Sequence, residues 1–349
     1  MKRVFASGIA LASVLGRHGK GVFETAAMLG SQNGATPEST VEEVAVLAEV
    51  SRSSGRPVSF GLTETVAGGD LHRQVLELVA EANRDGADIH PQTTVRSVGV
   101  LFGLAHHSPF GGSPAWRALL DLPFDQRLAA IRDPQQRAIL VADADDGSGI
   151  PADRLFPLDT VPADYRLDPE RSLAARAAAA GTTPGAHWID LLDRTDGACL
   201  LNWPFLNQTP AEVERLLADP NVVLGLADAG AHVGQIMDAS QPTWFLAHWV
   251  RDHGLYDLAA GVARLTSIPA ALFAIADRGT LAVGRPADVN VIDLDALALP
   301  LPEFRHDFPG GAGRWYQTAT GYELTLVNGV PTVEHGVHTG ALPGVTLRS

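Results

Sequence analysis

The residue with the clearest chemical potential in this sequence is Asp228, which follows a short apolar run at 222–226. That run is rich in β-branched residues and too short for a helix, which is typical of a strand buried on both faces. The sequence then changes to DAGAH, so a carboxylate at the strand end is followed by small residues and His232. This pattern is typical of the catalytic mouth of a parallel α/β sheet or barrel. A surface turn after a core strand is the alternative.

The elements before residue 96 alternate in the order that a parallel sheet requires. Apolar residues recur at helical spacing over 41–50, with Ser39 or Thr40 as the cap, and again over 71–82. Buried strands are expected at 21–27, 57–62 and 89–95. This rhythm predicts right-handed βαβ units around a parallel sheet.

Residues 2–15 leave two readings open. Lys2 and Arg3 followed by VFASGIALASVLG resemble the start of a secretory signal. No small-residue cleavage site follows, because Arg17, His18 and Lys20 come at once. We therefore expect an amphipathic helix that leads into the first strand.

The segment 96–220 interrupts the alternation, because Gly, Pro and Asp accumulate in it. We expect a long irregular insertion that acts as a lid or binding loop or is mobile. A helix at 171–180 and the aromatic stretch 200–208 would give it some core of its own. Its acidic cluster, Asp143, Asp145 and Asp146, fails the EF-hand spacing, since Arg154 stands where the bidentate glutamate belongs. We expect a solvated loop there.

The chain after Ser240 predicts helices first and strands later. A helix with Pro242 in its first turn is expected, followed by helices at 258–265 and from Ser267. His248 and His253 are five residues apart, so on an α-helix they would not share a face. Alternating strands around Asn328-Gly329 then predict a hairpin. We expect two domains, 1–277 and 278–349.

Composition excludes some classes of partner. The 349 residues carry a formal net charge of −14, which argues against nucleic acid or an anionic membrane as partner. No apolar run approaches the roughly 20 residues of a membrane-spanning helix. The single cysteine, Cys199, rules out an internal disulfide and is expected to be a buried small residue. A cytoplasmic location fits this cysteine usage.

Four segments together resemble a known family: GLADAGAHV at 225–233, PTWFLAHWVRD at 242–252, TSIPAALFAIADRGTLAVGRPADVNVID at 266–293 and HTGALPG at 338–344. They are similar to the amidohydrolase superfamily, in its D-aminoacylase (N-acyl-D-amino-acid deacylase) branch. The resemblance implies a TIM-like (β/α)8 barrel with a small β-sandwich, and hydrolysis of an amide by water activated on a divalent metal, zinc in particular. It matches Asp228 to the catalytic aspartate of the family, which exchanges protons with water and the leaving nitrogen.

Three further residues are candidates for the site. His232 would face the substrate or the metal. Arg96, just past its strand, would bind a substrate carboxylate through its fork or form a surface ion pair. His90 would be a metal ligand if it points into the barrel, or a core histidine if it does not. The substrate expected is an N-acyl amino acid or a related amide.

The sequence also departs from the family pattern. It contains no H-x-H pair, and the strands expected at 21–27 and 57–62 carry no histidine, only Glu24 and Glu64 nearby. The fold class expected is therefore α/β, the C-terminal part of the barrel with about four of its eight strands, plus the β-sandwich tail. A missing N-terminal half or a second chain would complete it. A catalytically inactive scaffold is the alternative function.

Overall fold

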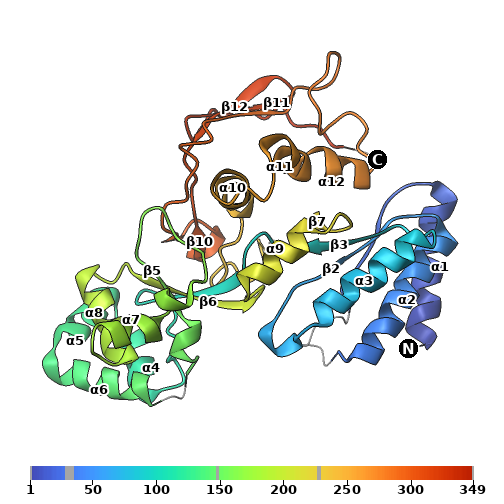
Figure 1. Cartoon of the computed structure of the whole chain (residues 1–349). Coiled ribbons are helices and arrows are strands. Elements are labelled where there is room, and N and C mark those ends of the chain that lie inside the picture. Colours follow the sequence, from blue (N-terminus) through green and yellow to red (C-terminus); the bar gives the residue numbers. More distant parts are fainter. Residues whose placement is uncertain (1, 28–34, 147–148, 226–228, 348–349) are drawn as a thin grey trace.

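The computed structural model describes residues 2–27, 35–146, 149–225 and 229–347, with side chains from residue 7 onward. Three regions follow one another along the chain: an N-terminal α/β region, an insertion, and a C-terminal region of helices and strands (Figure 1). None of the described helices is both long enough and apolar enough to cross a membrane.

The N-terminal region is built on a four-stranded sheet in which every pairing is parallel. Its order is β1 (Phe23–Thr25), β2 (Val58–Gly61), β3 (Ile89–Thr93) and β7 (Val223–Leu224). The strands predicted at these places are confirmed, although each is shorter than expected. The described strands form an open sheet, so a closed barrel is not confirmed.

Three helices cover one face of this sheet: α1 (Lys2–His18), α2 (Pro37–Ser54) and α3 (Leu71–Arg84) (Figure 1). Val58, Phe60 and Ile89 are fully buried and belong to the apolar core that these helices share. The helix expected at the N-terminus is confirmed. It approaches α2 closely, because a Cβ on Gly16 would lie 2.4 Å from the carbonyl oxygen of Ser54.

Helix α2 begins earlier than the sequence suggested. Thr36, not Ser39 or Thr40, is its N-cap, and the Thr36 and Ser39 side chains bond to each other's backbone N–H groups in a capping box. The helix ends at Gly55, whose φ of 63° is one that glycine adopts without strain.

The insertion is mostly regular, so the expectation of an irregular segment is wrong. A three-stranded antiparallel sheet in the order β4-β6-β5 lies against a group of helices, with Trp116 and Trp188 fully buried among them. Prolines at the starts of α4, α6 and α8 mark first turns rather than loops. The elements are β4 (Val98–Gly103), α4 (Pro114–Leu120), α5 (Phe124–Arg132), α6 (Pro134–Asp145), β5 (Phe156–Leu158), α7 (Leu173–Ala179), α8 (Pro184–Arg194), β6 (Leu200–Leu206) and then α9 (Pro210–Ala218).

The acidic cluster is not a solvated loop either. Asp143 lies on α6 and its carboxylate accepts hydrogen bonds from the Ser113 hydroxyl (2.6 Å) and the Ala115 N–H (3.1 Å) at the start of α4. Asp145 accepts from the Gly185 N–H (2.8 Å) at the start of α8. These carboxylates therefore satisfy free helix N–H groups.

The C-terminal region contains the predicted helices α11 (Leu258–Leu265) and α12 (Ser267–Leu272). The hairpin at Asn328-Gly329 is confirmed, with φ of 49° and 78° at these two residues. An antiparallel sheet has the order β13-β12-β11-β8, and β9 pairs with β10. The strands of these two sheets are β8 (Val289–Ile292), β9 (Glu303–Arg305), β10 (Arg314–Tyr316), β11 (Tyr322–Val327), β12 (Val330–Glu334) and β13 (Val337–His338). The 3₁₀-helices among the described residues are η2 (Val66–Gly68), η3 (Ala152–Arg154), η4 (Pro169–Arg171) and η6 (Pro309–Gly311). The domain boundary at 277/278 falls between α12 and β8 and stays a prediction.

The helix after Ser240 changes type along its length. It starts as α10 (Gln241–Trp244) and continues as the π-helix η5 (Phe245–Asp252). In a π-helix the N–H groups bond five residues back, and the His253 N–H accordingly donates to the His248 carbonyl at 2.8 Å. The two imidazole rings stack at 5.9 Å. Their spacing of five therefore brings the two rings together on this helix. Both also pack against tryptophan rings, His248 against Trp244 and His253 against Trp249.

Candidate active site

The candidate site lies at the carboxyl ends of the parallel strands, where the chain leaves β2, β3 and β7. In open α/β sheets ligands bind at this edge. Asp228 comes four residues after β7 ends, and it lies outside the described residues. The described residues at this edge and on the adjoining sheet face make up the rest of the candidate site.

The sheet face opposite the helices is polar. Register pairs Glu24 with Ser59 and Ser59 with His90, so these side chains share a face, and Gln92 shares it two residues further along β3. The Gln92 amide donates to Glu24 Oε1 (3.0 Å) and to Ser59 Oγ (2.9 Å), which ties three strands together. A Cβ on Gly225 would lie 2.5 Å from Gln92 Oε1, so the glycine after β7 leaves room for this amide.

His90 lies near the amino end of β3, away from the carboxyl edge. Its Nε2 is 2.7 Å from Asp88 Oδ1, and its side chain is 28% exposed. Within the described ranges, no group of three or more His, Cys, Asp and Glu side chains is arranged to hold a metal ion. The structure thus pairs the imidazole with an aspartate and lends no support to the prediction that His90 is a metal ligand.

Glu64 and Asn207 join the loops at the carboxyl edge. The Glu64 carboxylate, 3% exposed as a residue, accepts from the Thr209 N–H (2.9 Å) and hydroxyl (3.0 Å) at the start of α9. Asn207 Oδ1 accepts from the Glu64 N–H (2.8 Å), and its Nδ2 donates to the Thr93 and Thr94 hydroxyls (3.1 and 2.6 Å). These buried bonds fix the ends of β2 and β3. No sequence signal identified Asn207, because its partners are more than 110 residues away.

His232 lies in the turn that follows Asp228. Its side chain is exposed, and its φ is 47°. The His232 carbonyl accepts from the N–H groups of Gln235 (2.7 Å) and Ile236 (3.0 Å), which closes the turn. Two further bonds hold the segment: the Leu101 N–H of β4 donates to the Gln235 carbonyl, and the Trp315 N–H of β10 donates to the Val233 carbonyl, both at 2.8 Å. His232 is thus presented to solvent on an anchored turn.

Arg96 does not present its guanidinium to solvent. Its Nη1 is 2.8 Å from Asp238 Oδ1, and the two side chains are 3% and 2% exposed. Nη2 donates to the Met237 carbonyl at 2.9 Å, and the guanidinium lies 3.8 Å from the centre of the Tyr165 ring. Burial raises the pKa of Tyr165 to about 12. The prediction that Arg96 binds a substrate carboxylate is therefore wrong, because its guanidinium is bonded inside the protein. The alternative of a surface ion pair is also wrong, because the pair with Asp238 is buried.

Cys199 is the buried small residue that the sequence predicted. It is 1% exposed among the apolar side chains of the insertion. Burial raises the pKa of its thiol to about 12, so it stays protonated at neutral pH. This thiol is neither a nucleophile nor a metal ligand in this state.

A parallel sheet with a polar face, and a carboxylate expected at its carboxyl edge, define an α/β protein with an enzyme-like site. Residues 10–333 match the model of the amidohydrolase family. The chain therefore belongs to the amidohydrolase family, which confirms the resemblance read from its motifs.

Relatives with curated names match in parts. An N-acyl-D-glutamate deacylase of Alcaligenes xylosoxydans xylosoxydans is 49% identical over 55 residues, which are 16% of this chain and 11% of that protein. A D-aminoacylase of the same organism is 33% identical over 102 residues, 29% of this chain and 19% of that protein.

Solved structures match almost the whole chain. A D-aminoacylase, described as defining a novel subset of amidohydrolases, has a TM-score of 0.54 at 22% identity, covering 95% of this chain and 57% of that one. An N-acyl-D-glutamate deacylase of Bordetella bronchiseptica has the same TM-score at 20% identity, covering 99% and 59%. The chain thus spans a little over half the length of these structures.

These solved relatives bear on the predicted metal. A D-aminoacylase structure is described by its binuclear metal centre, and the Bordetella enzyme is complexed with zinc and a phosphonate inhibitor. A metal centre is thus described for both relatives, and zinc for the Bordetella enzyme, which is consistent with the divalent metal that the sequence predicted.

Proposed function

We propose that this protein hydrolyses the amide bond of N-acyl amino acids, of the D series in particular, with Asp228 as general acid and base. Family membership supports amide hydrolysis, and both curated relatives are deacylases of this kind. The observation that carries the proposal is the place of β7: it pairs in parallel with β3, so residue 228 follows a strand end at the ligand-binding edge of the sheet.

Asp228 would take a proton from the attacking water and return it to the leaving nitrogen. His232, exposed on the anchored turn four residues later, would bind the substrate. The Glu64–Asn207 bonds would keep the neighbouring strand ends in place during this chemistry, since catalytic geometry depends on rigid support.

The described residues do not by themselves fit the metal that the relatives contain. The polar sheet face offers one carboxylate, Glu24, already bonded to Gln92, and one imidazole, His90, already paired with Asp88. Zinc sites in enzymes use three protein ligands. Proton transfer is therefore assigned to Asp228, without a metal ion.

Hydrolysis of paired substrates tests the proposal. The protein is incubated with N-acetyl-D-glutamate, N-acetyl-D-leucine and their L enantiomers, with and without added Zn²⁺, and the released amine is quantified. We expect release from a D substrate, and Asp228→Asn should lower it at least about a hundredfold, as for loss of a general acid and base. Asp295→Asn, at an exposed aspartate of the C-terminal region, is the matched control.

A second pair of variants tests His232. His335 is also exposed with a positive φ, 46°, so His335→Ala controls for the backbone conformation of His232→Ala. We expect a higher KM in His232→Ala alone. Absence of hydrolysis of all four substrates with Zn²⁺ present would refute the proposal and favour the inactive scaffold.

A further inference from the structure

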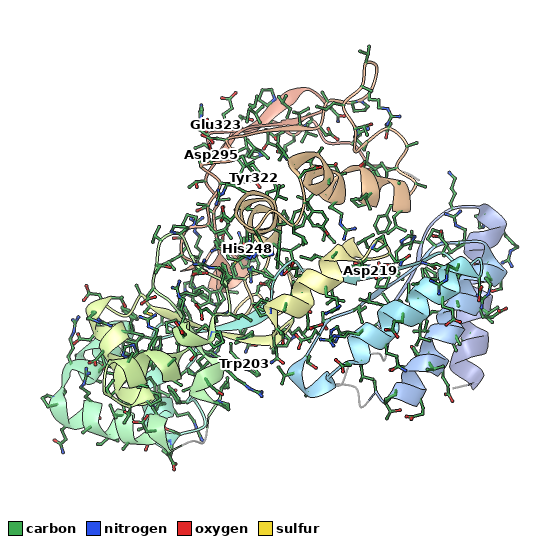
Figure 2. The ribbon with its side chains drawn as sticks, in the orientation of Figure 1. Trp203, Asp219, His248, Asp295, Tyr322 and Glu323 are labelled. Atoms are coloured by element: carbon green, nitrogen blue, oxygen red, sulfur yellow. The ribbon has the colours of Figure 1, made fainter. Side chains whose placement is uncertain are left out.

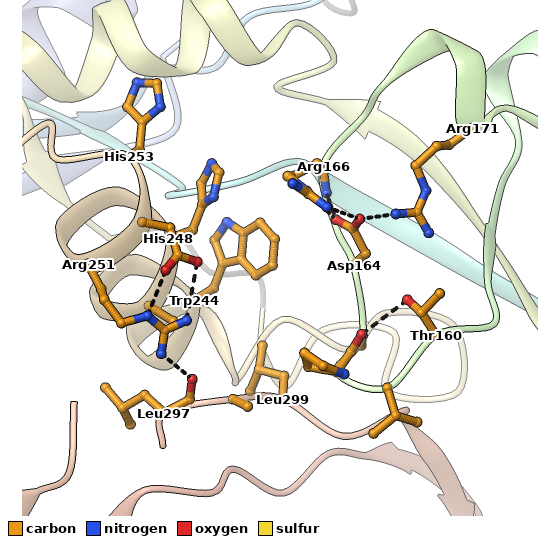
Figure 3. A pocket seen from close by; sticks show the side chains of 16 residues that line it. Thr160, Asp164, Arg166, Arg171, Trp244, His248, Arg251, His253, Leu297 and Leu299 are labelled. Atoms are coloured by element: carbon orange, nitrogen blue, oxygen red, sulfur yellow. Dashed lines mark hydrogen bonds and ion pairs between the residues drawn. The ribbon is translucent and has the colours of Figure 1, made fainter. Parts of the chain in front are cut away.

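A cavity of about 640 Å³ lies between the segment 160–171 of the insertion, the helix η5 and residues 297–299 (Figure 3). Its volume is within the range of small-molecule sites. Of the described candidate residues, His232, Arg96 and His90 are not among its lining residues. Figure 2 shows His248, which lines it, near the middle of the molecule.

One wall of the cavity is aromatic. The rings of Trp244 and His248 stack at 4.8 Å with 26° between their planes, and His253 extends this stack through the π-helical spacing. Burial lowers the pKa of His248, with smaller contributions from His253 and Arg166, so its imidazole is neutral at pH 7. Short π-helical segments are frequent at functional sites. This wall offers planar, uncharged surface.

The facing wall is cationic. Asp164 accepts from Arg166 at 2.9 and 2.7 Å and also pairs with Arg171, so one carboxylate serves two guanidinium groups (Figure 3). On η5 itself, Arg251 is balanced by Asp252 at 2.7 Å. The lining carries three arginines and two aspartates, so its arginines exceed its carboxylates by one. The whole chain carries a formal net charge of −14.

Aliphatic side chains complete the lining. Val161 and Pro162 come from the insertion, and Leu297 and Leu299 from the C-terminal region. The Ala163 N–H donates to the Leu299 carbonyl at 2.7 Å, which joins these two segments at the base of the cavity. An apolar group that binds here would therefore exchange contacts with water for contacts with aliphatic side chains.

We propose that this cavity binds a small organic carboxylate that carries a planar apolar group. The carboxylate pairs with Arg166, whose side chain is 61% exposed, and the planar group lies against Trp244 and His248. Because Arg166 Nε and Nη2 already donate to Asp164, the bound carboxylate would accept a charge-assisted hydrogen bond from Nη1. Binding at this cavity is measured without any hydrolytic activity, so its test does not depend on the proposed function.

Benzoate is the first probe, titrated into the full chain by calorimetry and by tryptophan fluorescence. Benzamide has the same shape without the charge, and acetate and inorganic phosphate have charge without the ring. We expect saturable benzoate binding at least about tenfold tighter than that of the other three, the difference that a charge-assisted hydrogen bond provides. Equal affinity for benzamide or acetate, or no saturable binding of benzoate, would overturn the proposal.

Variants then locate the bound probe. Arg166→Gln should weaken benzoate binding about tenfold, whereas Arg132→Gln should not. Arg132 is likewise an exposed arginine paired with aspartate, through Asp193 and Asp196, but it lies outside the cavity. Trp244 alone of the six tryptophans lines the cavity, so Trp244→Phe should remove the fluorescence change and keep the calorimetric binding. Equal loss in Arg132→Gln, or an unchanged fluorescence response in Trp244→Phe, would place the probe elsewhere and refute the assignment.

Discussion

Arg96 and Asp238 form an ion pair that is almost fully removed from solvent, with Nη1 and Oδ1 2.8 Å apart. The pair joins the segment after β3 to the segment before α10, and Tyr165 of the insertion covers the guanidinium. All three regions of the chain therefore meet at this arginine or next to it.

Replacing Arg96 with methionine should destabilise the protein by about 3–5 kcal/mol, because the Asp238 carboxylate would stay buried without its cation. Urea denaturation measures this as a lower midpoint. The double variant Arg96→Met/Asp238→Leu should recover part of the loss, since neither charge remains. Unchanged stability in Arg96→Met, with a raised KM for an N-acyl amino acid, would instead restore a role in substrate binding.

Glu212 should make folding stability depend on pH in acid. Hydrogen bonds from Arg73 (3.0 Å to Nε) and from His72 (2.7 Å) lower the pKa of Glu212 to about 2. A carboxyl with a lowered folded pKa stabilises the fold above its ordinary pKa of 4.5, and this stability is lost as the pH falls from there towards 2. Glu212→Gln should cost about 2 kcal/mol at pH 7 and flatten this part of the profile.

The matched control for Glu212 is Glu214→Gln on the same helix, where the side chain is 42% exposed. Its effect should be below about 0.5 kcal/mol. Thermal unfolding of the three proteins between pH 2 and 7 provides the comparison. Parallel profiles for wild type and Glu212→Gln would show that Glu212 does not produce the acid dependence.

Asn207→Ala should lower the free energy of unfolding by about 2–4 kcal/mol, since it removes the buried bonds to Glu64, Thr93 and Thr94. Asn207 has a φ of 52°, which also strains alanine. Asn207→Gly keeps the backbone free of strain and separates the two causes. If glycine restores full stability, the side-chain bonds contribute little.

Gly225→Ala should destabilise the sheet by about 1 kcal/mol, because the new methyl group displaces the Gln92 amide from Glu24 and Ser59. The effect should disappear in a Gln92→Ala background. A double-mutant cycle by chemical denaturation measures this coupling. If the two losses of stability are additive, the methyl group added by Gly225→Ala clashes with the backbone and does not displace the Gln92 amide.

Local periodicity was sufficient to predict the α/β region. Apolar spacing located α2, α3 and the parallel strands, and Asn328-Gly329 located the hairpin, because short-range backbone preferences decide these features. In the insertion the helix at 171–180 was predicted and corresponds to α7. Its other helices were missed because prolines and aspartates at their first turns resemble loop composition. The Arg96–Asp238 pair and the Glu64–Asn207 bonds connect residues more than 140 positions apart, which no local pattern encodes.

The motif resemblance correctly identified the family, but it could not place individual side chains. The position of Arg96 just past its strand indicated a substrate carboxylate or a surface ion pair, whereas the structure pairs it with the buried Asp238. The spacing of His248 and His253 was judged on an α-helix, whereas the helix is of the π type there. Spacing arguments depend on helix type, and helix type is set by tertiary packing.

The turn that carries His232 is fastened by backbone bonds to β4 at Gln235 and to β10 at Val233. The insertion, through β4, and the C-terminal strand β10 therefore both hold the turn at residues 232–236 in place. Shortening the chain before Trp315 would leave this turn with one support, so the tail shapes the mouth of the sheet from a distance of more than 80 residues along the sequence.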